Sequence, residues 1–375
     1  MKRVINKAAS ALTSPSAFTD PSFSAAVIAW QKQHGRHALP WQNTRDAYRV
    51  WLSEIMLQQT QVTAVIPYYQ KFLQSFPTVE SLATAPSEAV MAHWSGLGYY
   101  TRARNLHRCA QRVTAEYGGL FPDDPELLAD LPGIGRSTAA AIAAFAYGKR
   151  AAILDGNVKR VFARVFGVEG FPGAKAVEDQ LWLRAVALLP QTEMESYTQG
   201  LMDLGATLCV RGKPACARCP LSQRCVALAT GRTAELPVRK PKKAVPEKDT
   251  VMLVVSEGQH VLLQQRPDSG IWGGLLSLPE LPPSANADEF GLAVEHAMQG
   301  FGEIAACRKL PPFSHVFTHF KLHVAPYQVV LKHRLLQVAE SVYVWYPVAQ
   351  LVDAPLPAPV KKLLLGVLHS DDLLN

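Results

Sequence analysis

The chain has 375 residues, enough for two domains, and 48% of them are hydrophobic, so it can bury more than one core. Its formal charge of +7 favours an acidic partner such as nucleic acid, although many basic proteins bind none. The sequence contains no uninterrupted run of about 18 apolar residues, so we expect no transmembrane helix.

The first residues of the chain are basic and rich in Ala, Ser and Thr, with no acidic residue before Asp20. A transit peptide can have this composition, but the apolar core of a secretory signal is absent. We predict a disordered tail over residues 1–22.

From Phe23 onwards the pattern is helical, with segments of about 10–20 residues separated by Pro and Gly. We therefore predict an all-α domain over residues 23–230. Residues 231–248 include the basic run R-K-P-K-K and are predicted to form an extended linker, which could also lie along DNA.

After the linker the apolar pattern changes to that of strands. Residues 251–255 and 261–263 flank Glu257-Gly258 and predict a hairpin. Further strands are predicted at 322–324, 327–331 and 341–345, and helices at 287–298 and 360–368. Residues 249–375 therefore form a predicted α+β domain.

Four of the six cysteines lie within one short segment, as Cys209-x6-Cys216-x2-Cys219-x5-Cys225. Such clustering indicates a metal site rather than a disulfide framework. Both zinc and a [4Fe–4S] cluster accept four Cys ligands, but zinc sites usually pair two short Cys-x-x-Cys units, and only one is present. The spacing favours iron–sulfur, and four buried thiols remain an alternative.

The stretch L-P-G-I-G-R-S-T-A begins at Leu131 and lacks the spacing of a P-loop. A short turn between two helices would present backbone N–H groups at a helix N-terminus, which suits one DNA phosphate. A plain connection between two helices fits the stretch equally well.

Two acidic residues are candidates for chemistry. Glu54 lies in W-L-S-E-I-M-L-Q-Q-T-Q, on a predicted helical face with Trp51, Ile55, Gln58 and Val62, where it is either exposed at the edge or buried with a raised pKa. Asp155 lies in L-D-G-N-V-K-R and could cap a helix that begins near Val158. A protonated and an ionised carboxyl group together can break a glycosidic bond through an oxocarbenium-like state.

These motifs, in this order, resemble the helix–hairpin–helix DNA glycosylases with an iron–sulfur loop, and within them adenine DNA glycosylases of the MutY type. The resemblance rests on W-L-S-E-I-M-L-Q-Q-T-Q-V, G-L-G-Y-Y-T-R-A-R-N-L, L-P-G-I-G-R-S-T-A, L-D-G-N-V-K-R and the cysteine loop, and it spans residues 25–370. It implies an all-α glycosylase domain carrying a [4Fe–4S] loop, followed by an α+β Nudix-like domain.

The resemblance also implies the chemistry. Glu54 would protonate a flipped adenine, at N7, and Asp155 would stay ionised and stabilise the sugar cation. Ser137 and Asn157 would orient the water or Asp155. Related bifunctional enzymes carry a lysine at the position of Ser137, which forms a Schiff base, so a serine there implies simple hydrolysis. Lys159 could trap an aldehyde adventitiously.

The same resemblance implies the DNA contacts. Gln58 and Tyr99 would occupy the DNA stack, filling the space left by base extrusion. Gly133 and Gly135 would shape the phosphate-binding hairpin. The segment V-L-L-Q-Q-R-P-D-S-G-I-W-G-G resembles the opening of a Nudix hydrolase, but the metal-binding R-E-x-x-E-E helix is absent. This domain would therefore read 8-oxoguanine opposite the adenine, through Phe313, Ser314 and His315.

The implied substrate is double-stranded DNA with an A:8-oxoguanine or A:G mispair, and we expect a cytoplasmic monomer associated with a bacterial nucleoid. Three other functions are alternatives: a bifunctional glycosylase-lyase, a non-catalytic DNA-binding module with a redox-sensing cluster, and a nucleotide pyrophosphatase. Ser137 opposes the first, the two carboxylates oppose the second, and the missing metal-binding acids oppose the third.

Overall fold

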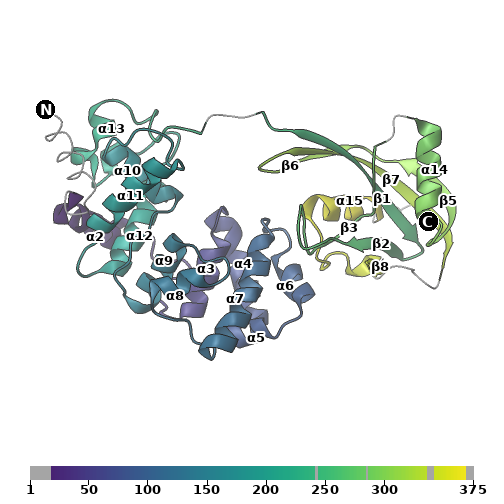
Figure 1. The fold of residues 1–375 in the computed structure, drawn as a ribbon, viewed down its shortest axis with the longest axis horizontal. Helices are drawn as coiled ribbons and strands as arrows, with labels where there is room; N and C mark the ends of the chain where they lie inside the picture. The colour runs from purple at the N-terminus through teal and green to yellow at the C-terminus, as the bar shows by residue number, and fades with distance from the viewer. Residues whose placement is uncertain (1–17, 241–243, 284–285, 336–341, 369–375) are drawn as a thin grey trace, which may run out of the picture. The chain divides into compact units, whose positions relative to one another are not determined.

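A computed structural model describes residues 18–240, 244–283, 286–335 and 342–368 (Figure 1). By their contacts, Met1–Thr84 and Arg108–Lys242 form one compact unit, and Ala85–His107 and Lys243–Asn375 form a second. The segment 85–107, which the sequence pattern places within the helical domain, thus groups with the second unit. Most of the predicted tail and the middle of the predicted linker lie outside the described residues.

The described part of the chain up to residue 230 is helical, as predicted (Figure 1). No helix among the described residues is long and apolar enough to cross a membrane. The α-helices are α2 (Pro21–His34), α3 (Ala47–Met56), α4 (Val62–Ser75), α5 (Val79–Ala83), α6 (Ser87–Trp94), α7 (Thr101–Tyr117), α8 (Pro125–Asp130), α9 (Arg136–Tyr147), α10 (Gly156–Val165), α11 (Lys175–Ala187), α12 (Met194–Asp203) and α13 (Val226–Ala229).

The prediction that Trp51, Gln58 and Val62 share one helical face is wrong. Helix α3 ends at Met56, and Val62 begins a new helix, α4. The backbone of Gln59 has a φ of 57°, in the left-handed region that a right-handed helix cannot contain. Gln58 therefore lies in the turn between the two helices.

The glycine-rich stretch forms a turn between α8 and α9, as predicted. Gly133 has a φ of 79°, a conformation that a side chain would strain, so glycine is required there. The alanines that follow are buried along α9, and their small side chains allow α3, α8 and α12 to pack closely against it. Helices α2, α9, α10, α11 and α12 share one apolar core.

In the second unit, the described residues after the linker form a mixed sheet of order β3-β2-β1-β7-β5. Strand β4 pairs with β1, β6 with β7, and β8 with β2. The strands are β1 (Glu247–Glu257), β2 (His260–Gln265), β3 (Leu276–Ser277), β4 (Glu280–Leu281), β5 (Gly302–Lys309), β6 (Phe313–Val316), β7 (Lys321–Arg334) and β8 (Tyr343–Pro347), with helices α14 (Ala287–Met298) and α15 (Ala358–Leu368).

The predicted hairpin around Gly258 is confirmed, because β1 and β2 pair antiparallel from Glu257 to His260. The two strands predicted on either side of Pro326 are instead one strand, β7. Pro326 falls between Val324, which pairs with β6, and Tyr327, which pairs with β5. A proline in this gap removes no bond from either ladder, so the strand continues through it.

Candidate functional site

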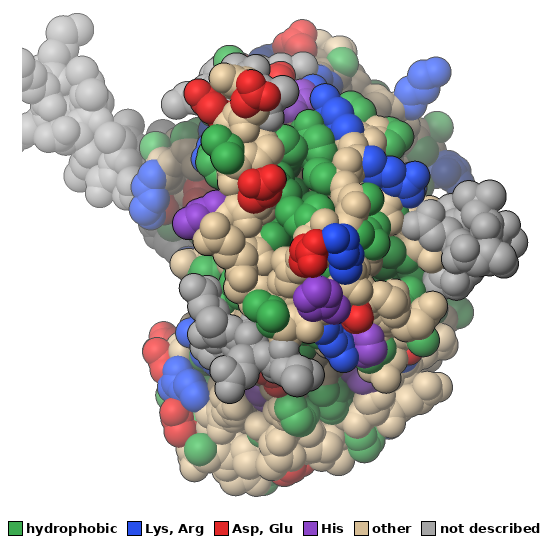
Figure 2. Space-filling view, turned by 90° about the vertical axis from the view of Figure 1, so that its right-hand side faces the viewer, with side chains coloured by type: hydrophobic (Ala, Val, Ile, Leu, Met, Phe, Trp, Pro, Cys, Tyr) green, Lys and Arg blue, Asp and Glu red, His purple; other side chains and the backbone are tan. Residues whose placement is uncertain are grey.

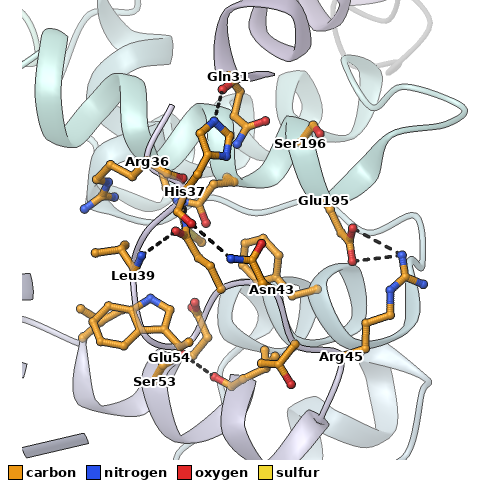
Figure 3. Close-up of a pocket in the computed structure, with 18 of the residues that line it drawn as sticks. Gln31, Arg36, His37, Leu39, Asn43, Arg45, Ser53, Glu54, Glu195 and Ser196 are labelled. Carbon is orange, nitrogen blue, oxygen red and sulfur yellow. Dashed lines mark hydrogen bonds and ion pairs between the residues drawn. The ribbon is translucent and has the colours of Figure 1, made fainter. Parts of the chain in front are cut away.

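Glu54 lines a cavity of about 540 Å³, within the size range of small-molecule sites (Figure 3). Helix α3 places Glu54 in its last turns, between the buried residues Ser53 and Ile55. The other walls come from α2, the loop of residues 36–45, and α12, which contributes Glu195, Ser196, Gln199 and Met202. Arg45 and Glu195 form an ion pair of 3.3 Å beside the cavity (Figure 3).

Asp155 caps the N-terminus of α10, as its sequence context predicts. Its carboxylate accepts hydrogen bonds from the backbone N–H of Val158 at 2.8 Å and from the side-chain amide of Asn157 at 3.2 Å. Asp155 is not among the residues that line the cavity, but its charge reaches Glu54. The capping role and a role beside Glu54 are therefore compatible.

The two carboxyl groups differ in what surrounds them. Burial, and then the neighbouring charge of Asp155, raises the pKa of Glu54 to about 8. Burial also raises the pKa of Asp155, but the hydrogen bonds from Val158 and Asn157 and the charge of Arg160 all lower it. Asp155 thus has partners that stabilise its anion, whereas both causes that shift the pKa of Glu54 favour its protonated form.

Ser137 lies in the first turn of α9, directly after the glycine turn. Its Oγ accepts a hydrogen bond of 2.9 Å from the backbone N–H of Leu154. Gln58 reaches the same turn, where its Nε2 lies 3.5 Å from the carbonyl oxygen of Gly133, at the outer limit of a hydrogen bond. Gly135 caps α9 and is exposed.

Asn157 and Lys159 follow Asp155 on α10 and have different partners. The Asn157 Oδ1 accepts a hydrogen bond of 2.7 Å from Arg160, which also donates to the backbone carbonyls of Gly205 and Cys209, both at 2.6 Å. Lys159 forms an ion pair of 2.7 Å with Glu178. Asn157 thus links Asp155 to the segment that leads into the cysteine loop, whereas Lys159 points to α11.

The four clustered cysteines line one largely apolar cavity. Short helical turns at Leu204–Leu208, Cys216–Arg218 and Ser222–Arg224 shape the loop around them. Buried Arg164 donates to the Cys209 sulfur at 3.3 Å. In the part of the chain that the structure describes, no three His, Cys, Asp or Glu side chains converge closely enough to hold a single metal ion. The four cysteine side chains thus share one cavity.

The remaining predicted contacts lie in the second unit. Tyr99 is exposed, with a left-handed φ of 51°, and the guanidinium of Arg102 lies 5.5 Å from its ring centroid. Ser314 Oγ shares a hydrogen bond of 2.8 Å with His323 Nδ1, and His315 packs edge-on against Phe317. Ser314 and His315 thus occupy successive positions of strand β6.

The structure adds candidates that the sequence reasoning missed. Gln59 is exposed and has a left-handed φ of 57°, and such strain in a residue other than glycine concentrates at functional sites. The exposed Thr318 and His319 form the turn between β6 and β7, and they lie in F-T-H, which repeats the chemistry of F-S-H four residues earlier. That repeat was a signal available in the sequence. Gln199, on the cavity wall, had none.

Charged side chains of both signs lie on the face of the molecule shown in Figure 2, with apolar side chains between them. The net charge of +7 is therefore not spread over that face as one basic surface. In the first unit, basic residues accompany the cysteine loop. Arg224 there is paired with Asp20 at 2.6 Å.

A family model described as HhH-GPD superfamily base excision DNA repair protein matches residues 52–185, and a NUDIX domain model matches residues 250–366. The chain is 36% identical over 343 residues to the adenine DNA glycosylase of Buchnera aphidicola subsp. Acyrthosiphon pisum, covering 91% of this chain and 96% of that one. It is 33% identical over 398 residues to the adenine DNA glycosylase of Mus musculus, covering 91% and 77%.

A solved structure of a thermostable thymine-DNA glycosylase matches with a TM-score of 0.51 and 31% identity, covering 56% of this chain and 96% of that chain. These matches confirm the predicted fold class and the predicted class of enzyme. The chain belongs to the family of adenine DNA glycosylases.

Proposed function

We propose that this protein is a monofunctional DNA glycosylase that hydrolyses the N-glycosidic bond of adenine mispaired with 8-oxoguanine or guanine in duplex DNA. One observation carries the proposal. The carboxyl group of Glu54 faces a cavity, and its pKa is raised to about 8 by burial and by the charge of the hydrogen-bonded Asp155 carboxylate. This is the division of labour that cleavage of a glycosidic bond requires.

In the proposed mechanism, adenine leaves the duplex and enters the cavity beside Glu54. Glu54 donates its proton to N7, and the bond from the sugar C1′ to N9 breaks with its electron pair passing to the base. The Asp155 carboxylate stabilises the sugar cation. Water then adds to C1′, and its proton returns to the Glu54 carboxylate.

Asn157 and Ser137 act in this mechanism by positioning Asp155. Asn157 donates to the Asp155 carboxylate directly, and Ser137 holds the backbone of Leu154, the residue before it. A hydroxyl at position 137 cannot form an imine, and the amine of Lys159 is held in an ion pair with Glu178. Both observations favour hydrolysis over lyase chemistry.

For DNA binding, we propose that the turn containing Gly133 and Gly135 contacts one backbone phosphate. Gln58, from the adjoining turn, and Tyr99 would contact the stacked bases. The exposed, left-handed Gln59 is a further candidate beside Gln58. Backbone strain of this kind clusters at functional sites.

The C-terminal domain would read the base opposite the adenine through the β6–β7 hairpin. Phe313, Ser314 and His315 are the residues that the resemblance indicates, and the exposed residues Thr318 and His319 offer the same polar groups at the turn between β6 and β7. Replacing Ser314 and Thr318 singly with alanine distinguishes the two sets. The variant that loses preference for 8-oxoguanine over guanine identifies the reader.

We propose that Cys209, Cys216, Cys219 and Cys225 hold a [4Fe–4S] cluster. All four line one cavity, and their spacing contains one short Cys-x-x-Cys unit, whereas zinc sites usually pair two such units. When bound, the cluster would hold the loop in shape. Arg164 would donate to the first ligand sulfur, offsetting part of the negative charge.

The test is single-turnover excision on duplexes containing A:8-oxoguanine, A:G and A:T, with and without alkali. We expect release of adenine from the two mispairs, and strand breakage only after alkali. Breakage without alkali would replace the proposal with a glycosylase-lyase. Duplex binding without release of adenine would replace it with a non-catalytic DNA-binding module.

A further inference from the structure

Arg164, near the end of α10, is buried, with a relative exposure of 2%. A buried guanidinium needs acceptors for its N–H groups. Its Nε donates to the backbone carbonyl of Leu236 at 2.8 Å. Its Nη1 donates to the backbone carbonyl of Val210 at 2.7 Å and to the Cys209 sulfur at 3.3 Å. One side chain therefore joins the start of the cysteine loop to a residue that follows the loop.

Leu236 lies just before the exposed part of the linker. Its side chain is buried, whereas residues 238–240 are exposed. Its backbone N–H donates to the carbonyl of Arg232 at 3.1 Å, and the Arg232 guanidinium forms an ion pair of 2.8 Å with Glu169, which follows α10. Two arginines thus hold this short segment near the end of α10, and Arg164 holds the residue from which the linker departs.

The other end of the linker is also anchored. The backbone N–H of Lys321, at the start of β7, donates to the carbonyl of Pro246 at 2.9 Å. The chain between the two anchors therefore comprises residues 237–245. Without the contact to Arg164 it would extend back to the end of α13 and comprise residues 230–245. The effective concentration that a tether produces falls with about the −3/2 power of its length, so this lengthening lowers it about twofold.

We propose that Arg164 is a positioning residue that fixes where the chain leaves the helical region, and that it makes this exit depend on the cysteine loop. The inference rests on the proposed function, because it takes Cys209 and Cys225 as ligands of the cluster. The carbonyl oxygen of Arg164 lies 3.5 Å from the Cys225 sulfur, so this residue contacts two of the four cysteines. A bound cluster would fix both sulfurs, and a thiolate accepts the bond from the guanidinium more strongly than a thiol.

The exit of the linker matters for reading the base opposite the adenine. In the proposed function this reading belongs to the C-terminal domain, which the linker joins to the helical region. A short linker raises the effective concentration of that domain at the DNA. The cluster would thus contribute about twofold to opposite-base selectivity without contacting a base.

The experiment is limited digestion of the full-length, cluster-loaded protein with trypsin. In the unmodified protein, trypsin should cut after the exposed Arg239, and the peptide bond after Arg232 should be protected. Arg164→Met removes the anchor, and cleavage after Arg232 should become about tenfold faster, the effect of one hydrogen bond from a charged group. Mass spectrometry separates the two products, and iron content shows that the cluster is retained. Arg218→Met, at an exposed arginine of the same loop, is the matched control and should keep the original pattern.

Two readouts distinguish a positioning role from a general loss of stability. A less stable protein would also be cut inside its helices, for example after Arg184 in α11, whereas release of the linker exposes the Arg232 bond alone. A less stable protein would also excise adenine more slowly from A:8-oxoguanine and A:G alike. Release of the linker should instead lower the ratio of the two single-turnover rates about twofold.

If Arg164→Met does not fold, Arg164→Lys keeps the charge, but its compact ammonium cannot replace the fork that reaches both Leu236 and Val210. It should expose the same bond. Cys219→Ser should do so as well, with Arg164 still present. An Arg232 bond that stays protected in the Arg164 variants, or cleavage spread through the helices, overturns the inference. A colourless unmodified protein instead overturns the proposed cluster, while digestion of the Arg164 variants still decides whether this residue anchors the linker.

Discussion

The hydroxyl of Ser137 accepts a hydrogen bond from the backbone N–H of Leu154 at 2.9 Å, joining the start of α9 to the residue before Asp155. The bond spans 17 residues of sequence. Ser137 is thus placed to act on Asp155 through the backbone, and its hydroxyl does two things at once. It stands where related lyases carry a lysine amine, and it accepts a hydrogen bond from a peptide N–H beside Asp155, the residue proposed to stabilise the sugar cation.

We predict that Ser137→Ala slows excision and destabilises the fold. The variant leaves the Leu154 N–H without its acceptor, which costs about 1–3 kcal/mol. Single-turnover rates and thermal melting measure the two effects. Ser137→Thr keeps the hydroxyl and serves as the control. A Ser137→Ala protein with unaltered rate and melting temperature would show that the bond has no importance.

We predict that excision by the unmodified protein declines as the pH rises through about 8, because Glu54 then loses the proton it must donate. Glu54→Gln cannot donate this proton, and its rate should fall by about 10²–10⁴-fold. Single-turnover rates across pH measure both effects, with duplex binding as the control for folding. A normal rate in Glu54→Gln would remove Glu54 from the mechanism.

The raised pKa of Glu54 also predicts a stability effect. Its folded pKa of about 8 lies above the ordinary value of 4.5, so the folded state binds the extra proton. This contribution is complete below pH 4.5 and is lost as the pH rises through about 8. We expect Glu54→Gln to melt at a higher temperature than the unmodified protein at pH 8, with a smaller difference near pH 5. A difference independent of pH would contradict the assignment of the proton.

We predict that the purified protein is brown and contains iron. Cys219→Ser removes one of the four thiols around the cavity, so it should lose iron and melt at a lower temperature. Cys307 is exposed and lies outside the loop, so Cys307→Ser is a matched control that should keep both properties. Metal analysis and melting curves test the pair. A colourless protein with one zinc ion would replace the cluster with a zinc site.

Arg136, the first residue of α9, has its guanidinium 3.9 Å from the ring centroid of Trp182. The attraction between a guanidinium and an indole ring holds the cation in one place. It therefore fixes Arg136 directly after the glycine turn. We predict that Arg136→Ala weakens duplex binding and reduces the slope of log affinity against log salt by about one. Arg136→Lys should keep the slope. An unchanged slope in the alanine variant would place Arg136 away from the phosphates.

Much of this protein could be predicted from local patterns. The turn at Gly133, the cap at Asp155 and the hairpin at Gly258 each depend on a few neighbouring residues, and all are present. The predicted helix around Glu54 was wrong beyond Met56. Hydrophobic residues continue there at helical spacing, but the left-handed backbone of Gln59 lies in a turn that ends the helix.

The sequence by itself determined the order of the domains, the family and the candidate acids, since these follow from motifs a few residues long. Tertiary structure decided what the candidates contact. The Arg36–Asp203 pair joins residues 167 positions apart, and Gln199 lines the cavity because α12 packs against α2. Local propensity carries no information about such pairs, because they form only when distant helices pack together.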